Sequence, residues 1–177
     1  MLVDNDSSST SYVPRELIVL LRQNFALDWH GHHGGSHWSR VRLNGLALAK
    51  ETGADCVVVE FFAFLHDSCR ENEHADPGHG GRAANLVLGL PNKLLPLSDT
   101  QRECLAEACR GHTGGTHHDN PTVATCWDAD RLDLIRVGIE TDPALLLTTS
   151  ARSPHMIDRA RSRAEAWLEK RYVGRER

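Results

Sequence analysis

Five segments of this 177-residue chain place a histidine or an aspartate in line with apolar residues at helical spacing. Residues three, four and seven apart share one face of an α-helix, so these polar side chains point toward the same interior as their apolar neighbours. Burying them without partners costs several kcal/mol, so the fold must supply a common partner. The five polar residues are His37 (with Val41 and Leu48), His66 (with Val59, Phe62 and Ala63), His79 (with Ala83, Leu86 and Leu90), His112 (with Leu105, Ala108 and Cys109) and Asp130 (with Val123, Cys126 and Trp127).

A divalent cation is the partner that suits this set of side chains. Asp67 follows His66 directly, and no Lys or Arg occupies a matching inward position. Imidazole and carboxylate ligands without thiolate are typical of sites for Mn, Fe, Co, Ni, Zn or Mg, and the sequence leaves the choice among these metals open. The five cysteines form no C-x-x-C pair and are odd in number, so neither a disulfide framework nor a thiolate zinc site is expected.

The pattern along the chain predicts an all-α, single-domain helical bundle with a central metal site. Helix start and stop signals recur, and no segment alternates with period two. The run CVVVEFFAFL could also be a buried strand, although its length favours a helix. Residues 1–13 are interpreted as a flexible tail and 14–177 as the domain. Helices are expected at about 17–27, 37–52, 55–66, 79–90, 99–111, from 121 toward 137, briefly from 142, and at 154–172.

Composition narrows the class of protein further. The formal charge of −4 leaves no excess of basic residues to grip a phosphate backbone, so a nucleic-acid polymer is not an expected partner. No run of about 18 apolar residues predicts a membrane span. The Ser-rich, acidic start of the chain lacks the features of a secretory signal, which favours a cytoplasmic protein.

The ordered polar residues resemble a known family. His37, then His66-Asp67, then Asp130 look like the H…HD…D motif of the HD-domain superfamily of metal-dependent phosphohydrolases, within a similar stretch of roughly residues 30–140. The segments HWSRV (37–41), FLHD (64–67) and DADRLD (128–133) are similar to its motifs. So are His79-Gly80 opening a helix and His112-Thr113 closing one.

This resemblance implies an all-helical fold with a metal at its centre, ligated by His37, His66, Asp67 and Asp130. Asp130 is chosen over Asp128 because it precedes Arg-Leu and lies on the inward stripe; Asp128 is expected to be solvated or behind the ligands. His79 and His112 stand where family members with two metals have further histidines. The chain is therefore expected to hold one or two divalent ions, the alternative being that both histidines donate hydrogen bonds to substrate phosphate.

Candidate catalytic residues surround the predicted ligands. Arg40 and Arg70 are candidate guanidinium clamps for phosphate oxygens, and Arg131 adjoins Asp130; for each of the three, a surface salt bridge is the alternative. Glu71, four residues after Asp67, could orient the attacking water or take its proton, and Asp67 itself is expected to be essential for catalysis. His33, His117 and His118 could reach the site, although solvated loop positions are favoured for them.

The predicted function is hydrolysis of a small phosphorylated metabolite, with a nucleotide as the preferred substrate. Two alternatives stay open: an HD-fold di-iron oxygenase, and a non-catalytic, nucleotide-binding regulatory module. The loops at 68–78 and 113–119 are expected to decide specificity. The last helix carries Ala160, Ala164, Trp167 and Leu168 on one side, so it is expected to pack against the bundle, and a homodimer contact there is a further alternative.

Overall fold

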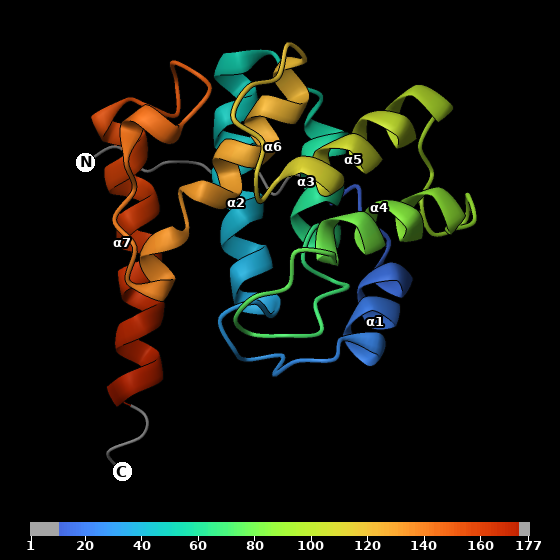
Figure 1. Cartoon of the computed structure of the whole chain (residues 1–177), viewed down its shortest axis with the longest axis horizontal. Helices are drawn as coiled ribbons and strands as arrows, with labels where there is room; N and C mark the ends of the chain where they lie inside the picture. The colour runs from blue at the N-terminus through green and yellow to red at the C-terminus, as the bar shows by residue number, and fades with distance from the viewer. Residues whose placement is uncertain (1–10, 174–177) are drawn as a thin grey trace.

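The computed structural model describes residues 11–173, and within them all regular structure is helical (Figure 1). This confirms the predicted all-α fold class. Two short 3₁₀ helices, η1 and η2, lie between the last two α-helices. The elements are α1 (Arg15–Asn24), α2 (Gly35–Thr52), α3 (Cys56–Leu65), α4 (His79–Gly89), α5 (Asp99–Gly111), α6 (Pro121–Arg131), η1 (Leu134–Val137), η2 (Pro143–Leu145) and α7 (Pro154–Val173).

Local signals in the sequence explain most helix ends. Gly53 closes α2 in the left-handed region at φ 71°, a conformation that glycine adopts without steric cost. Asp55 starts α3 by accepting hydrogen bonds from the backbone amides of Val57 and Val58, and the CVVVEFFAFL run is a helix. The segment after Arg131 was expected to continue α6 and does not.

The early end of α6 has a physical reason in Asp133. This residue has a non-helical backbone (φ −98°, ψ 8°), its side chain is fully buried, and it faces His37 and Arg40 of α2. The chain therefore tightens into η1 instead of continuing as α6. Gly138, at φ 78°, ends η1.

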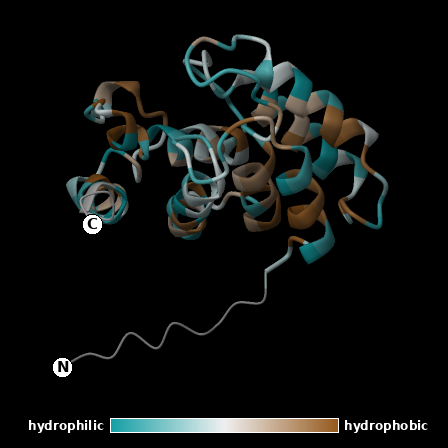
Figure 2. Cartoon of the chain, turned by 90° about the horizontal axis from the view of Figure 1, so that it is seen from below, coloured by the Kyte–Doolittle hydropathy of each residue, from teal (hydrophilic) through white to brown (hydrophobic). Residues whose placement is uncertain are grey.

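Helix α3 lies inside the bundle, so its C-terminal end opens into the protein centre. It contacts α2, α5 and α6, while α4 packs along α5. Almost every side chain of α3 is buried, including Val58, Phe61, Phe62 and Leu65. Figure 2 shows hydrophobic residues on the inner sides of the central helices and hydrophilic ones outside. This packing carries His66, the residue after α3, to the middle of the molecule.

The two ends of the described chain are held by side-chain contacts. Residues 1–10 of the expected tail lie outside the described residues, but Ser11 and Tyr12 both donate hydrogen bonds to the buried carboxylate of Glu60 (2.8 and 2.9 Å). Residues 11–13 are therefore attached to α3, because Glu60 needs partners inside the protein. At the other end, α7 packs against α2 and η1 along one side of the bundle, with Ala160 and Ala164 buried (Figure 1).

No helix within residues 11–173 combines the length and apolar character that crossing a membrane requires.

Candidate metal centre

Side chains from α2, α6 and the end of α3 converge on one point. Nε2 of His37 lies 3.1 Å from Nε2 of His66, 3.6 Å from Oδ2 of Asp67 and 3.4 Å from Oδ1 of Asp130. Nε2 of His66 lies 3.8 Å from Oδ2 of Asp67 and 3.7 Å from Oδ1 of Asp130. Ligand atoms ~2.1 Å from one ion are ~3.0 Å apart in octahedral and ~3.4 Å apart in tetrahedral geometry. His37, His66 and Asp67 are thus spaced closely enough to share one ion, and Asp130 lies next to both imidazoles.

A second group of possible ligands shares Asp67 with the first. Oδ1 of Asp67 lies 3.1 Å from Nε2 of His79, which begins α4, and 3.6 Å from Nε2 of His112, which follows α5. The two imidazole nitrogens are 2.8 Å apart. Asp67 therefore directs Oδ2 toward the first group and Oδ1 toward the second. These two clusters, His37–His66–Asp67 and Asp67–His79–His112, are buried and could each hold an ion.

In each of the four imidazoles, the hydrogen bond made by Nδ1 determines whether Nε2, which faces the centre, can accept a metal ion. Every Nδ1 atom faces an oxygen that can only accept, so in the neutral form of each ring Nδ1 carries the proton and Nε2 presents its lone pair inward. The acceptors are Asp133 Oδ2 for His37, the Phe62 carbonyl for His66, the Asp76 carbonyl for His79 and the Cys109 carbonyl for His112.

These inward lone pairs repel one another unless a cation lies between them. The Nε2 atoms meet in pairs at 3.1 and 2.8 Å, next to carboxylate oxygens. Oδ1 of Asp67 is buried and accepts no hydrogen bond from any residue in 11–173. A fully buried carboxylate oxygen without a donor is costly, and a cation removes that cost. The residues present therefore fit a divalent metal.

The protonation states suit metal binding as well. Burial lowers the pKa of His66 to about 3, so its imidazole is neutral at physiological pH. Burial opposes charge on Asp67 and Asp130, but nearby imidazoles, above all His66 for Asp67 and His37 for Asp130, outweigh it and hold both carboxyl pKa values below their ordinary range. His66 thus offers a neutral imidazole, and Asp67 and Asp130 offer charged carboxylates, the forms that ligate metals.

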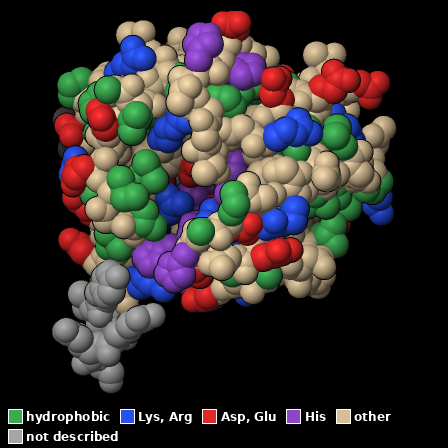
Figure 3. All heavy atoms as spheres, viewed as in Figure 1, with side chains coloured by type: hydrophobic (Ala, Val, Ile, Leu, Met, Phe, Trp, Pro, Cys, Tyr) green, Lys and Arg blue, Asp and Glu red, His purple; other side chains and the backbone are tan. Residues whose placement is uncertain are grey.

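The centre is closed on most sides and open on one. The side chains of His37 and His66 are wholly buried, whereas Asp130 is 15% exposed, Arg70 11% and His33 10%. These three residues therefore mark the side through which a substrate could enter. Figure 3 shows histidine side chains inside a hollow on this face and a further group of histidines at the lower end of the hollow.

Comparison with known proteins identifies the fold that brings these side chains together. No protein-family model and no curated protein matches the chain. A crystal structure of a predicted HD superfamily hydrolase from an uncultured Thermotogales bacterium does match, with a TM-score of 0.65 and 24% sequence identity, over 94% of this chain and 95% of that one. The chain has the HD-domain fold. The resemblance inferred from the ordered histidines and aspartates is thereby confirmed at the level of the fold.

The HD-type bundle adds one residue that the sequence analysis missed. Asp133 is fully buried and accepts a hydrogen bond from Nδ1 of His37 (2.8 Å), which fixes the orientation and proton position of that ring. A signal was present, because Asp133 follows Asp130 by three residues and so lies on the same face of the helix that the sequence predicts from 121 toward 137. No role had been assigned to it.

Arg40 lies behind this carboxylate instead of facing the substrate side. It donates from Nε and Nη2 to Asp133 (2.6 and 2.9 Å), it is buried, and its guanidinium stacks on the ring of Trp167 in α7 at 4.6 Å. The expected phosphate clamp is therefore placed differently, because Asp133 needs a buried cation as partner. Arg40, Asp133 and Trp167 together support His37 from the side of α7.

The other candidate catalytic residues divide into near and distant ones. Nη1 of Arg70 lies 3.5 Å from Oδ1 of Asp67 and 3.4 Å from Nε2 of His79, at the open side, where a phosphate clamp would have to be. Glu71 is not brought to the centre: its side chain is 70% exposed and lies 3.6 Å from Arg82. The expectation that Glu71 handles the attacking water has no support from this placement.

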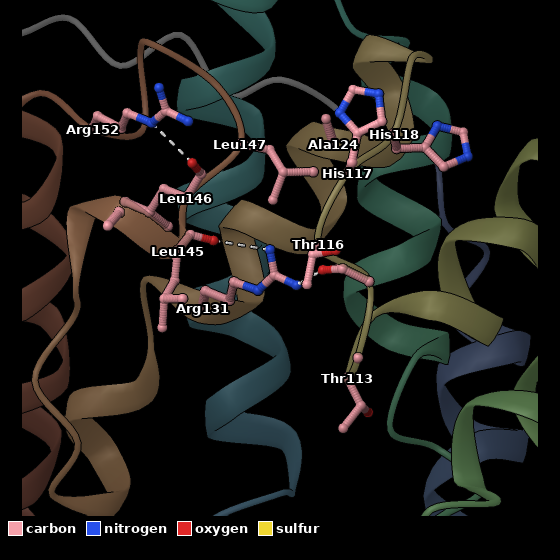
Figure 4. Close-up of a pocket in the computed structure, with 13 residues that line it drawn as sticks. Thr113, Thr116, His117, His118, Ala124, Arg131, Leu145, Leu146, Leu147 and Arg152 are labelled. Atoms are coloured by element: carbon pink, nitrogen blue, oxygen red, sulfur yellow. Dashed lines mark hydrogen bonds between the residues drawn. The ribbon is translucent and has the colours of Figure 1, made fainter.

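Arg131 lies in a separate pocket of about 400 Å³ between the loop at 113–118 and the segment at 144–147 (Figure 4). Its two terminal nitrogens donate to the carbonyls of Leu145 and Gly115, so both are engaged within the protein. Thr113 at the edge of this pocket contacts Nε2 of His79 at 3.4 Å. Arg131 thus braces two loops and does not reach the ligands.

Two further expectations are corrected. Asp128 is neither solvated nor behind the ligands: it is buried and accepts hydrogen bonds from the amides of Leu147 and Thr148 and from the Thr148 hydroxyl, which fastens the 146–148 segment. His33 is buried instead of solvated, because Glu73 pairs with its Nδ1 at 2.7 Å.

The remaining loop histidines lie farther out. The side chain of His117 is 81% exposed, as expected for a solvated position, and His118 pairs with Glu107 at 3.0 Å.

Proposed function

We propose that this protein is a metal-dependent phosphohydrolase that acts on a small phosphorylated metabolite, with a nucleotide as the preferred substrate. One observation carries the proposal. Four imidazoles donate from Nδ1 to outer acceptors and direct their Nε2 lone pairs at the carboxylates of Asp67 and Asp130. A donor set of this kind attracts a divalent cation to the space between its members. The likeness in fold to a predicted HD superfamily hydrolase supports the same class of reaction.

The chain's own residues would have distinct parts in such a reaction. A divalent cation in this centre would lower the pKa of a bound water from 15.7 toward ~7 and withdraw charge from a phosphoryl oxygen. Asp67 lies between the two histidine groups and offers one carboxylate oxygen to each. Arg70, at the open side, can donate to a non-bridging phosphate oxygen. Asp133 keeps the proton of His37 on Nδ1, so that Nε2 would be free to ligate a metal.

Elemental analysis and phosphate release test the proposal together. Full-length protein is loaded with Mn²⁺, Fe²⁺, Co²⁺, Ni²⁺, Zn²⁺ or Mg²⁺ and incubated with nucleotides, sugar phosphates and aryl phosphates. We expect bound metal and metal-dependent phosphate release, both of which Asp67→Ala and His66→Ala abolish. His155→Ala, at an exposed position of α7, is the matched control and should change neither. Loaded protein that releases no phosphate from any ester of the panel would contradict the proposal.

A di-iron oxygenase is the second candidate, favoured by the two histidine groups that share Asp67. It predicts retention of two irons per chain, a mixed-valence EPR signal and substrate-dependent consumption of O₂. Tight nucleotide binding without turnover, together with a lower melting temperature after chelation, would instead favour a regulatory module.

A further inference from the structure

A pocket of about 840 Å³ is lined in part by His33, one of the three more exposed residues around the candidate centre. The 32–33 and 73–74 segments, η1 and the end of α7 line it. The volume lies in the range of small-molecule sites, roughly 300–1,000 Å³. The 73–74 segment belongs to one of the two loops expected from the sequence to decide specificity. We call this space the His33 pocket.

His33 connects the pocket to the centre. Its ring meets that of His37 edge-on, with the ring centroids 6.5 Å apart, while the same side chain lines the pocket. Arg136, another lining residue, has Nε 3.8 Å from the Asp133 carboxylate that holds His37. His33 is therefore the side chain that the pocket and the surroundings of the centre have in common.

One wall of the pocket is cationic. Arg136 is buried, and it donates from Nε to the His32 carbonyl and from Nη1 to the Asp133 carbonyl, while its Nη2 makes no hydrogen bond to any residue in 11–173. Arg171 adds a second guanidinium, which donates from Nη1 to the His30 carbonyl and stacks on the Trp167 ring at 5.3 Å. The single lining carboxylate, Glu73, is already paired with His33. The balance of charge therefore favours an anionic group.

The other wall is apolar. Ile135, Val137 and Leu168 line it, and Val137 is 38% exposed although it is a large hydrophobic residue. An apolar body placed against these side chains would remove them from water, a favourable contribution. In the 400 Å³ pocket beside Arg131, both terminal nitrogens of that guanidinium already donate to carbonyls.

We propose that the His33 pocket binds the organic part of the phosphoester, and that it selects esters in which this part combines an apolar body with a second anionic group. The proposal rests on the proposed function, and it names the substrate class. The second anion would pair with the guanidinium groups of Arg136 and Arg171, and the apolar body would lie on Val137 and Leu168. A carboxylate and a phosphate are equivalent as this second anion, because both accept hydrogen bonds from guanidinium groups.

Two matched pairs of esters test the selection on Mn²⁺-loaded protein. One pair is phenyl phosphate and 4-carboxyphenyl phosphate; the other is adenosine 5′-monophosphate and adenosine 3′,5′-bisphosphate. We expect at least one doubly anionic ester to have a KM lower by about tenfold than its partner, the effect of one charge-assisted hydrogen bond. The pair that shows the preference identifies the second anion as carboxylate or phosphate.

Substitutions test whether the difference in KM between singly and doubly anionic esters arises in the His33 pocket. Arg171→Gln removes a cation and Val137→Glu adds an opposing charge, so both should abolish most of the tenfold difference in KM. Ile139→Glu makes the same kind of change two residues from Val137, at a position 53% exposed and outside the lining, and should leave the difference intact. Equal KM values within both pairs, or an equal effect of Ile139→Glu, would overturn the proposal.

A binding measurement separates this proposal from the proposed function. Adenosine 3′-monophosphate, the organic product of the bisphosphate reaction, is titrated calorimetrically and needs no turnover. One outcome is that the protein binds this nucleotide, loses at least tenfold in affinity on Val137→Glu, and yet releases no phosphate from any ester. That result would support the proposed role of the pocket and would contradict the proposed hydrolase function. Phosphate release without any preference in KM and without product binding would refute the pocket alone.

Discussion

Replacing Asp133 by Asn tests whether the carboxylate behind His37 strengthens metal binding. Asp133 accepts from Nδ1 of His37 at 2.8 Å and from two nitrogens of Arg40 at 2.6 and 2.9 Å, and it is fully buried. Asn has nearly the same shape but no charge, and one of its two terminal atoms is a donor. It can therefore satisfy His37 or Arg40 only in part.

The expected magnitude follows from these contacts. Loss of an outer hydrogen-bond partner of a metal-binding histidine lowers metal affinity by about 10–100-fold. The same change weakens a buried ion pair, and removing one partner of such a pair costs ~3–5 kcal/mol. Since Asp133→Asn keeps one acceptor oxygen, we expect a loss near the lower end of that range. Domains of this kind have a stability of ~5–15 kcal/mol, so the variant should stay folded.

Glu60→Gln supplies the matched control. Glu60 is also a buried carboxylate paired with an arginine of α2, since Arg42 Nε lies 2.5 Å from it, but it touches no imidazole. Isothermal titration with Mn²⁺ gives the dissociation constants, and thermal unfolding of the metal-free proteins gives the loss of stability. Both variants should melt earlier than the natural sequence, but only Asp133→Asn should bind Mn²⁺ about 10–100-fold more weakly.

Unchanged Mn²⁺ affinity in Asp133→Asn, with a loss of stability like that of Glu60→Gln, would refute the reasoning. Asp133 would then be a structural ion-pair partner of Arg40 alone. The rise in melting temperature on adding Mn²⁺ gives a second measure of affinity, because it depends on the dissociation constant of Mn²⁺ from the folded protein. This rise should be smaller in Asp133→Asn than in the natural sequence, and it should be unchanged in Glu60→Gln.

Two further predictions concern the neighbourhood of α4. A Cβ on Gly80 would lie 2.5 Å from the carbonyl oxygen of Cys109 in α5, so Gly80→Ala must push α4 and α5 apart. EPR titration with Mn²⁺ should then show weaker Mn²⁺ binding at the second histidine group, whereas binding at the first group should be unchanged. An Arg82 hydrogen bond lowers the pKa of Asp76 from 3.8 to about 2, so its stabilising contribution is complete above pH 3.8 and is lost as the pH falls toward 2. Urea unfolding should therefore show Asp76→Asn to be less stable than the natural sequence at neutral pH, with the difference vanishing near pH 2; a difference independent of pH would contradict this.

The sequence alone was sufficient to predict most of the helices and the residues that converge on the candidate metal centre. Helical spacing placed His37, His66 and Asp130 on apolar stripes, and a side chain on such a stripe must face the core whatever the packing partner is. Local signals such as Gly53 and Asp55 marked helix ends because they act within one turn. These features depend on short stretches of chain, which a sequence displays directly.

The tertiary structure determined which side chains contact the residues of the centre from outside. Asp133 meets His37 across 96 positions of the chain, and His33 meets Glu73 across 40. No periodicity links residues so far apart. Glu71 follows Asp67 by four residues yet points outward, because the chain has left α3 by then and helical spacing no longer applies. The sequence therefore determined which residues enter the centre, whereas the packing of α2, α6 and α7 determined how they are held and which side remains open.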